Sequence, residues 1–319
     1  MIGIFGAGAF GTALAVTLAQ DGTHVLLGGR DARAIADMEK FDQNRKYLPD
    51  VSFPDALQVT RDNDALSQCD ILLFAVPAQN LRDAFSALMP RNMLVLCAKG
   101  IEQATGLLQS QIAEEFLPRD QIAVLSGPSF ASEIAISKPT ALSIACANPT
   151  KLKQVQSALS RKNLRLYANE DVLGVQIGGA LKNVYSIACG IAAGANLGES
   201  ARASLMTRSF AEMARFAEFS GAERATLFGL SGFGDLVLSA SSKKSRNFSY
   251  GFEAAEKGAF EPDKTVEGIA TTHALARIAD DNQIDLPICQ NLSAFLRGSK
   301  TLPEISDTLL SRPLKDERA

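Results

Sequence analysis

A single charged residue, Lys182, lies within a long neutral stretch of the sequence. From Val172 to Gly198 every other residue is apolar, small or neutral, so a helix formed here would be buried on nearly all sides and would carry the ammonium group inward. Burial disfavours the charged form of a lysine and lowers its pKa, which lets the amine give and take a proton near neutral pH. The sequence therefore predicts that Lys182 is a proton-transfer group.

Two glycines accompany this lysine. Gly178 and Gly179 lie four and three residues before Lys182, so on a helix they share its face. Two interpretations are open at this point. The glycines leave room for a ligand beside the ammonium group, or they only allow close helix packing while Lys182 extends its ammonium group to solvent.

Other polar segments could meet Lys182 in the folded chain. The glycine-rich segment 229–235 reads as a loop and ends in the carboxylate of Asp235. Ser242 to Asn247 combines basic residues with hydrogen-bond donors at a predicted helix start, which is suited to holding a phosphate. Lys99 and the segment 126–129 each follow a predicted strand. Taken singly, each of these features is also typical of an ordinary turn or a solvated group of charges.

The beginning of the chain predicts a dinucleotide-binding unit. A short strand from Ile2 to Phe5 leads into a G-x-G-x-x-G turn formed by Gly6, Gly8 and Gly11, and a helix and a second strand are predicted to follow. In such a unit the first glycine forms the tight turn, the second lets the backbone approach a pyrophosphate, and the third lets helix and strand pack closely. The pyrophosphate is expected at the amino terminus of the helix.

The segment after the second predicted strand bears on which dinucleotide binds. It reads Gly28-Gly29-Arg30-Asp31, at the position where the ribose of the cofactor is expected. An arginine there accommodates the 2′-phosphate of NADP, whereas an acid accepts a hydrogen bond from the 2′-hydroxyl of NAD. Arg30 favours NADP, and Asp31 keeps NAD as the alternative.

Further strands recur along the first half of the chain. They are predicted at residues 71–75, 93–97, 122–125 and 141–145, separated by helical stretches such as 81–88 and 106–116. This alternation is typical of a parallel sheet covered on both faces, which binds ligands at the carboxyl ends of its strands. After residue 169 the pattern becomes helical. We expect an α/β fold in which residues 1–169 form a Rossmann-type, doubly wound, mostly parallel dinucleotide-binding domain, followed by an all-helical substrate-binding and catalytic domain at residues 170–319.

Composition excludes several classes of function. Acidic residues outnumber basic ones by 35 to 32, with no long basic run, so neither a nucleic acid nor a membrane is an expected partner. The five cysteines are widely spaced and form no Cys-x-x-Cys pair, which favours reduced thiols in the cytoplasm over disulfides or a zinc site. With only two histidines, a metal centre built on several histidines and a histidine–carboxylate catalytic pair are both disfavoured, and we expect no metal.

Together these segments closely resemble the bacterial NAD(P)-dependent glycerol-3-phosphate dehydrogenase family. The most specific matches are Leu-Ser-Gly-Pro-Ser-Phe-Ala from residue 125, Gly-Gly-Ala-Leu-Lys-Asn-Val from residue 178, and Gly-Asp-Leu with the later Ser-Arg-Asn between residues 234 and 247. The matching segments span nearly the whole chain: 6–15, 44–49, 99–102, 125–135, 178–183 and 229–247. One departure is Gly28-Gly29, where the family often carries a bulkier residue before the arginine.

The resemblance implies a reaction and a role for each matching residue. The reaction is reversible hydride transfer between NAD(P)H and dihydroxyacetone phosphate, with Lys182 as the catalytic proton acceptor. Beyond the loop glycines, the implied cofactor contacts are Phe10, Arg30, Lys99, Ala131, Arg246 and Glu267. The implied contacts to the small-molecule substrate are Lys99, Gly127, Ser129, Asp235, Ser245, Arg246 and Asn247.

The resemblance also implies a cytoplasmic homodimer that supplies glycerol 3-phosphate for phospholipid synthesis. Two other functions remain as alternatives. A related lysine-dependent dehydrogenase of the same two-domain build could act on a hydroxy acid, but it would need a carboxylate-binding group in place of the Ser245-Arg246-Asn247 segment. A non-catalytic nucleotide sensor would bind the dinucleotide without needing a buried Lys182.

Overall fold

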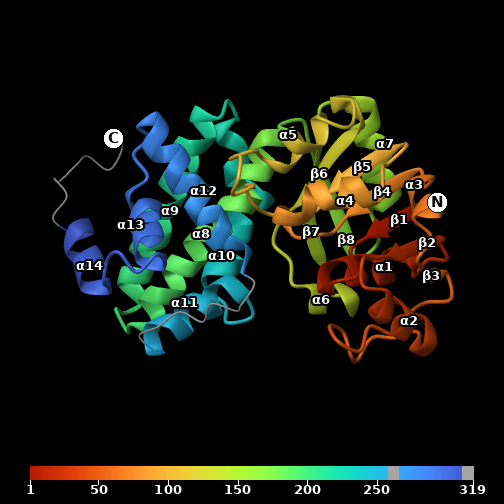
Figure 1. Cartoon of the computed structure of the whole chain (residues 1–319), viewed down its shortest axis with the longest axis horizontal. Helices are drawn as coiled ribbons and strands as arrows, with labels where there is room; N and C mark the ends of the chain where they lie inside the picture. The colour runs from red at the N-terminus through yellow and green to blue at the C-terminus, as the bar shows by residue number, and fades with distance from the viewer. Residues whose placement is uncertain (258–265, 311–319) are drawn as a thin grey trace.

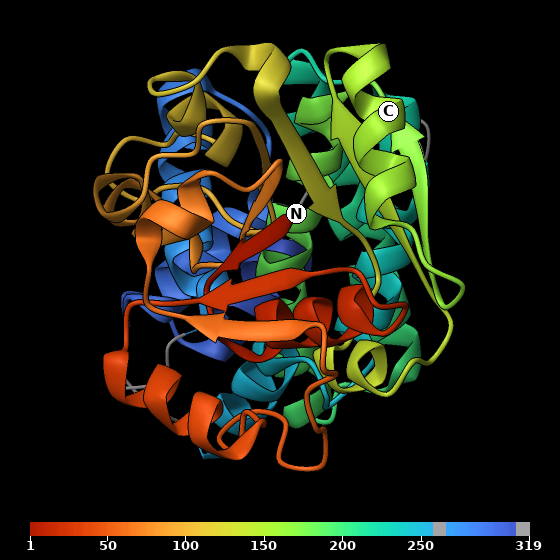
Figure 2. The same ribbon diagram turned by 90° about the vertical axis from the view of Figure 1, so that its right-hand side faces the viewer.

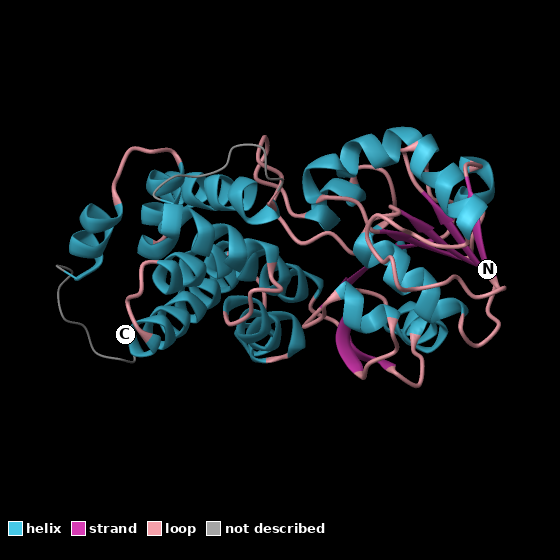
Figure 3. Ribbon diagram, turned by 90° about the horizontal axis from the view of Figure 1, so that it is seen from below, coloured by secondary structure: helices cyan, strands magenta, loops and turns pink. Residues whose placement is uncertain are grey.

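The computed structural model describes residues 1–257 and 266–310 of the chain. It has two parts, an amino-terminal domain built around a β-sheet and a carboxyl-terminal domain of helices, which lie side by side along the long axis of the molecule (Figure 1). All the strands of the described chain belong to the first domain, as the colouring in Figure 3 shows. The expected fold, a Rossmann-type sheet followed by a helical domain, is confirmed.

The amino-terminal domain holds one eight-stranded sheet with the order β3-β2-β1-β4-β5-β6-β7-β8. Its strands are β1 (Ile2–Phe5), β2 (Val25–Gly28), β3 (Leu57–Thr60), β4 (Ile71–Phe74), β5 (Met93–Leu96), β6 (Ile122–Ser126), β7 (Thr140–Cys146) and β8 (Leu164–Asn169). All neighbours pair in parallel except β6 and β7, which are antiparallel. Figure 2 faces this domain and shows the twist of the sheet from its first strands, in red and orange, to its yellow-green last ones.

Helices cover the sheet and form the second domain. The amino-terminal domain contains α1 (Ala9–Ala19), α2 (Ala32–Phe41), α3 (Asn63–Ser67), α4 (Leu81–Ala87), α5 (Gln109–Glu114), α6 (Ala131–Ala135) and α7 (Pro149–Leu159), with short 3₁₀ turns η1 (Ala78–Asn80) and η2 (Arg119–Gln121). The carboxyl-terminal domain contains α8 (Val172–Gly194), α9 (Glu199–Phe219), the turns η3 (Arg224–Phe228) and η4 (Leu230–Gly234), α10 (Asp235–Ala240), α11 (Arg246–Lys257), α12 (Glu267–Asn282), α13 (Pro287–Leu296) and α14 (Leu302–Leu310).

The direction of β7 follows from the short connection that precedes it. Between β6 and β7 the chain forms only the five-residue helix α6, which packs against α1. A parallel return would need a crossover long enough to bring the chain back to the opposite edge of the sheet. The chain therefore re-enters the sheet from the edge at which β6 ended, and β7 runs antiparallel to it.

Hydrophobic side chains form separate cores on the two faces of the sheet and inside the helical domain. Along β4, Ile71 and Leu73 face one core while Leu72 and Phe74 face the other. This alternation explains why the strand reads as a continuous apolar run.

The helix α8 lies at the centre of the helical domain. It packs against α9, α10, α11 and α12, and also against β6 and β7 of the sheet (Figure 1). Its contact with α11 is made through glycines: a Cβ on Gly190 would lie 2.1 Å from the carbonyl oxygen of Phe248, and one on Gly251 would lie 2.2 Å from that of Ile187. The two helices therefore touch backbone to backbone. Despite the apolar character of α8, no helix in residues 1–257 and 266–310 has the length and hydropathy of a membrane span.

Candidate active site

Lys182 is buried and paired. Its side chain is only 11% exposed, and its Nζ lies 3.1 Å from Oδ1 of Asp235. The ammonium group also donates a hydrogen bond of 2.8 Å to Oγ of Ser239, and that hydroxyl in turn donates to the Asp235 carboxylate. Since the ammonium group stays inside the protein, the interpretation in which Lys182 extends to solvent is wrong.

A second lysine binds the other oxygen of the same carboxylate. Nζ of Lys99, at the carboxyl end of β5, lies 2.6 Å from Oδ2 of Asp235 and donates to the carbonyl oxygen of Gly127 at 2.9 Å. Asp235, whose side chain is fully buried, thus lies between two ammonium groups that come from different domains. The structure brings together four residues that the sequence placed in separate segments: Lys99, Gly127, Lys182 and Asp235.

This arrangement shifts the pKa values of both Lys182 and Asp235. Burial lowers the pKa of Lys182 to about 8, with a further lowering by the charge of Lys99, while the carboxylate of Asp235 opposes the shift. Burial by itself would raise the pKa of Asp235, but the two ammonium groups outweigh it and the pKa lies below its usual value. Asp235 is therefore ionised at neutral pH, and Lys182 can exchange a proton close to neutrality.

The glycines beside Lys182 serve protein packing. A Cβ on Gly179 would lie 2.3 Å from Oγ of Ser126, at the end of β6, and one on Gly178 would lie 2.6 Å from the carbonyl oxygen of Ser231. The interpretation that these glycines leave room for a ligand is wrong, because the ends of β6 and η4 fill that space. Close packing, the other interpretation, describes them.

The glycine-rich segment before Asp235 is helical rather than a loop, so the loop prediction is wrong there. It forms the π-helical turn η4, which runs directly into α10 and places Asp235 in the first turn of that helix. The backbone is compact enough that a Cβ on Gly232 would lie 2.1 Å from the carbonyl oxygen of Leu227. The glycines thus allow a tight helical turn that carries the carboxylate to Lys182.

Two asparagines link the lysine helix to neighbouring elements. Asn183 donates through Nδ2 to the carbonyl oxygen of Lys99 at 3.0 Å and accepts from Nδ2 of Asn247 at 2.8 Å. Oδ1 of Asn247 in turn accepts from the backbone N–H of Gly268 at 3.0 Å. Sequence reasoning assigned Asn247 to the substrate and gave Asn183 no role. The available signal was its position next to Lys182 within an otherwise apolar run.

The amino end of α11 presents polar groups next to this network. As predicted, a helix starts within the segment 242–247: Ser245 is buried just before α11, and Arg246 begins that helix with an exposed side chain. In the described part of the chain, the guanidinium group of Arg246 forms no ion pair. Its charge lowers the pKa of the nearby Glu267, although burial has the larger effect and the pKa of that carboxyl is raised overall. Arg246 is thus available to bind an anion.

The loop between β1 and α1 has the shape that a pyrophosphate requires. Gly6 has a φ of +123°, which favours glycine, and a Cβ on Gly11 would lie 2.0 Å from the carbonyl oxygen of Gly6. A Cβ on Gly8 would instead meet nothing within 4 Å, and no side chain caps the amino terminus of α1. Gly8 therefore lies beside open space at a helix amino terminus, where a phosphate fits.

Buried Asn44 supports this loop, a role that the sequence reasoning missed. Its Nδ2 donates to the carbonyl oxygen of Ala7 at 3.1 Å and to Oγ1 of Thr12 at 2.8 Å. Nearby, Phe10 and Ala131 pack against the same small hydrophobic cluster, which joins α1 to α6. These two predicted cofactor contacts come from distant parts of the chain and are brought together.

The end of β2 carries the residues expected to face the ribose. Asp31 caps α2 and accepts hydrogen bonds from the backbone N–H groups of Arg33 and Ala34 at 3.0 and 3.1 Å. The side chain of Arg30 is 81% exposed, 4.0 Å from the Asp83 carboxylate, and it is not part of the Lys182 cluster. Close packing explains the glycine at position 28, because a Cβ there would lie 2.5 Å from a methyl group of Leu66.

The remaining predicted positions, Ser129 and Glu267, lie close to the cluster of Lys99, Lys182 and Asp235. Ser129 donates to the carbonyl oxygen of Gly127 at 3.4 Å, and Glu267 accepts from the backbone N–H of Ala78 at 3.4 Å. Across residues 1–257 and 266–310, no three His, Cys, Asp or Glu side chains are grouped so that they could hold a metal ion.

Comparison with known proteins identifies similar chains over the full length. Residues 1–152 match the family model for the NAD-dependent glycerol-3-phosphate dehydrogenase N-terminus, and residues 171–307 match that for its C-terminus. The chain is 48% identical to a glycerol-3-phosphate dehydrogenase (NAD(P)+) of Roseobacter denitrificans and 45% identical to one of Ruegeria, each over 99% of both chains. A crystal structure of glycerol-3-phosphate dehydrogenase from Coxiella burnetii is similar with a TM-score of 0.88 at 30% identity, over 98% of each chain.

Proposed function

The chain belongs to the NAD-dependent glycerol-3-phosphate dehydrogenase family, and we propose that it interconverts dihydroxyacetone phosphate and glycerol 3-phosphate with Lys182 as the proton donor and acceptor. The observation that carries this proposal is the buried Asp235 carboxylate held between the ammonium groups of Lys99 and Lys182. When bound, the nicotinamide cofactor supplies or accepts the hydride at C2 of the three-carbon substrate. The protein must then move one proton at the C2 oxygen.

Lys182 is suited to this proton transfer because its pKa of about 8 leaves both protonation states accessible near neutrality. In the reducing direction its ammonium group donates a proton to the carbonyl oxygen, and in the oxidising direction the neutral amine takes the hydroxyl proton. Asp235 and Ser239 hold the amine in place. Lys99 stabilises the negative charge that develops on the C2 oxygen.

Binding of the substrate phosphate is assigned to the start of α11. Arg246 provides a charged, bidentate donor there, with Ser245 beside it. Asn247 connects this segment through Asn183 to the backbone of Lys99, so the phosphate site and the ammonium groups are held in one hydrogen-bond network. We further assign the segment from Gly127 to Ser129 to the substrate hydroxyl groups. Anchoring the phosphate orients C2 for the reaction.

The cofactor site is proposed at the loop of Gly6, Gly8 and Gly11, with the open space at Gly8 for the pyrophosphate. Phe10, Ala131 and Glu267 would complete its walls, together with Lys99 and Arg246. We favour NADP over NAD because the carboxylate of Asp31 is engaged in capping α2, whereas the exposed side chain of Arg30, 4.0 Å from the exposed carboxylate of Asp83, can turn to meet a 2′-phosphate.

Family membership supports three wider parts of the proposal. They are a cytoplasmic location, a homodimeric assembly, and the supply of glycerol 3-phosphate for phospholipid synthesis. We also place the boundary between the dinucleotide-binding domain and the helical domain between residues 169 and 170, where β8 ends and the chain turns into α8.

A direct assay tests the function. Purified protein is mixed with dihydroxyacetone phosphate and either NADPH or NADH, and the loss of reduced-nicotinamide absorbance is followed. We expect oxidation of both cofactors, faster with NADPH, and loss of the NADPH preference in Arg30→Asp. Lys182→Met serves as the inactive control. A lack of turnover with both cofactors, combined with turnover of a 2-oxo acid that inorganic phosphate does not inhibit, would replace this proposal with the hydroxy-acid dehydrogenase alternative.

A further inference from the structure

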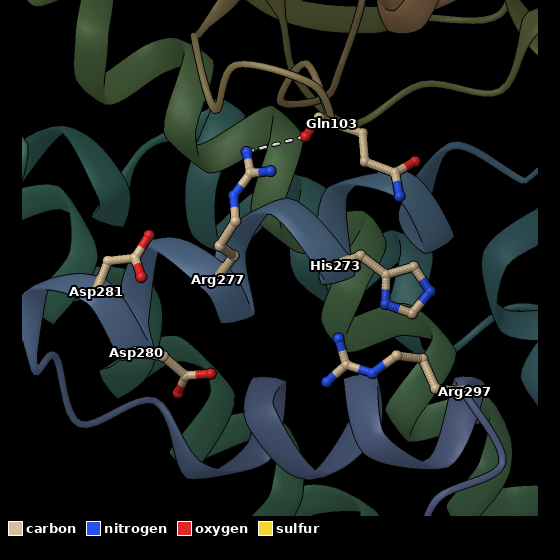
Figure 4. A pocket seen from close by; sticks show the side chains of 6 residues that line it. All are labelled: Gln103, His273, Arg277, Asp280, Asp281 and Arg297. Atoms are coloured by element: carbon tan, nitrogen blue, oxygen red, sulfur yellow. Dashed lines mark hydrogen bonds between the residues drawn. The ribbon is translucent and has the colours of Figure 1, made fainter.

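A pocket of about 330 Å³ lies away from the proposed active site, between α12, α13 and the segment that follows β5. Figure 4 shows the six side chains that line it: Gln103, His273, Arg277, Asp280, Asp281 and Arg297. Its volume is at the lower end of the range of small-molecule sites. None of the six side chains has a role in the proposed reaction.

One side of this pocket is cationic. Arg297 and His273 lie next to each other there, with Arg277 one helical turn away on α12 (Figure 4). The guanidinium group of Arg297 forms no hydrogen bond or ion pair with any group in residues 1–257 and 266–310. The guanidinium group of Arg277 donates to the carbonyl oxygens of Gln103 and Ala104, at 2.9 and 3.3 Å, and forms no ion pair within the described residues.

The imidazole of His273 is held in position. Its Nδ1 lies 3.0 Å from Oγ of Ser293, on the neighbouring helix α13. Burial and the positive charge of Arg297 both lower the pKa of His273, which favours the neutral ring. If Nδ1 accepts from the serine hydroxyl, Nε2 carries the proton and is a further donor.

The opposite side of the pocket is acidic. Asp280 and Asp281 lie together at that side (Figure 4), and Asp280 accepts a hydrogen bond of 2.6 Å from Nε2 of Gln290. Because like charges repel, these carboxylates oppose the entry of an extended polyanion. The pocket is therefore suited to a compact ligand with its negative charge on one end.

The pocket is separate from the proposed substrate site. None of its lining residues is a proposed substrate or cofactor contact, and His273, the lining residue nearest to the proposed cofactor contact Glu267 on α12, is six residues beyond it, roughly 9 Å along the helix axis. The carbonyl groups that Arg277 holds nevertheless belong to the segment that begins at Lys99, so the two sites share one piece of backbone.

We propose that this pocket is a second, non-catalytic binding site for a small phosphate dianion, held by Arg277, Arg297 and His273. Two guanidinium charges and a neutral N–H donor match the charge and the several acceptor oxygens of a phosphate group better than a single carboxylate.

Histidine NMR tests this site directly, because the chain contains only His24 and His273. The full-length protein is labelled at the imidazole rings and titrated with inorganic phosphate, against sodium chloride at matched ionic strength. We expect the His273 signal to shift saturably with phosphate only, while the signal of the exposed His24 stays in place. Repeating the titration with glycerol 3-phosphate and with acetate separates phosphate esters from carboxylates.

Three variants identify where the phosphate binds. Arg297→Gln is expected to weaken phosphate affinity, read from the His273 shift, about tenfold or more, because a charge-assisted contact is lost. Arg119→Gln, at an exposed arginine of the other domain, and Arg246→Gln, in the proposed substrate site, are expected to leave the response unchanged. The proposal is overturned if the shift is not saturable, if chloride or acetate reproduces it, if it persists in Arg297→Gln, or if Arg246→Gln abolishes it.

Discussion

Replacing Asp235 with asparagine separates the electrostatic role of this carboxylate from its shape. The carboxylate lies 3.1 Å from Nζ of Lys182 and raises the pKa of that amine against the lowering by burial and by Lys99. Loss of an opposite charge at this distance changes a pKa by about 1–3 units. The pKa of Lys182, about 8 in the native protein, is therefore expected to fall towards 6 in Asp235→Asn.

The sign of the effect depends on the direction of the reaction. Reduction of the ketone requires protonated Lys182, so kcat/KM is highest below the pKa of Lys182 and is lost as the pH rises through it. At pH 7 the protonated fraction would drop from ~90% to ~10% when the pKa moves from 8 to 6, a loss of about tenfold from protonation alone. Oxidation of the alcohol requires the neutral amine, and its pH profile would shift in the same direction.

The assay is the pH dependence of kcat/KM for reduction of dihydroxyacetone phosphate, from below pH 6 to above pH 9. Ser239→Ala is the matched control, because it removes the 2.8 Å hydrogen bond to Lys182 but leaves the negative charge. Thermal unfolding of each variant shows whether the fold is kept. The conclusion that the Asp235 charge raises the pKa of Lys182 would be refuted if the inflection stays at its native pH in Asp235→Asn. It would also be refuted if the inflection moves as far in Ser239→Ala as in Asp235→Asn.

Two further predictions concern stability. Lys182→Met should abolish turnover yet leave the melting temperature unchanged or raised. The reason is that it removes a buried ammonium group and leaves Asp235 paired with Lys99. A fall of more than about 4 °C in the melting temperature, measured by calorimetry, would contradict this. Gly179→Ala should cost about 1–3 kcal/mol in urea unfolding because its Cβ would lie 2.3 Å from Oγ of Ser126. Ser126→Ala removes a buried hydroxyl that has no partner, so by itself it should not destabilise the protein. Combined with Gly179→Ala, it should restore most of the stability that Gly179→Ala loses. A double variant as unstable as Gly179→Ala would contradict the packing interpretation.

The strands that the sequence predicted are those with continuous apolar runs, and the two that it missed lie at the edges of the sheet. In β3 (Leu57–Thr60) and β8 (Leu164–Asn169) buried and solvent-accessible positions alternate, so no apolar run marks them. The antiparallel direction of β7 was also not predicted, because it depends on α6 being only five residues long and on its packing against α1.

The residues of the site were easier to predict than their arrangement. Lys182 was recognisable as an isolated charge in an apolar helix, and Gly6, Gly8 and Gly11 by their spacing. That Asp235 lies between Lys182 and Lys99 could not be read from positions so far apart in the chain. The role of Gly178 and Gly179 was equally hidden, because a glycine next to a ligand and a glycine next to another backbone have the same sequence.

The backbone contact between α8 and α11 bears on how substrates of different length are distinguished. Lys182 is carried by α8, the proposed phosphate site begins α11, and the carbonyl oxygens of Phe248 and Ile187 occupy the places where Gly190 and Gly251 would carry a Cβ. At these two glycines no side chain separates the helices, so backbone contact sets their spacing there. If α11 binds the phosphate as proposed, this spacing would fix the distance from phosphate to amine, and a longer phosphorylated ketone would require a shift of whole helices.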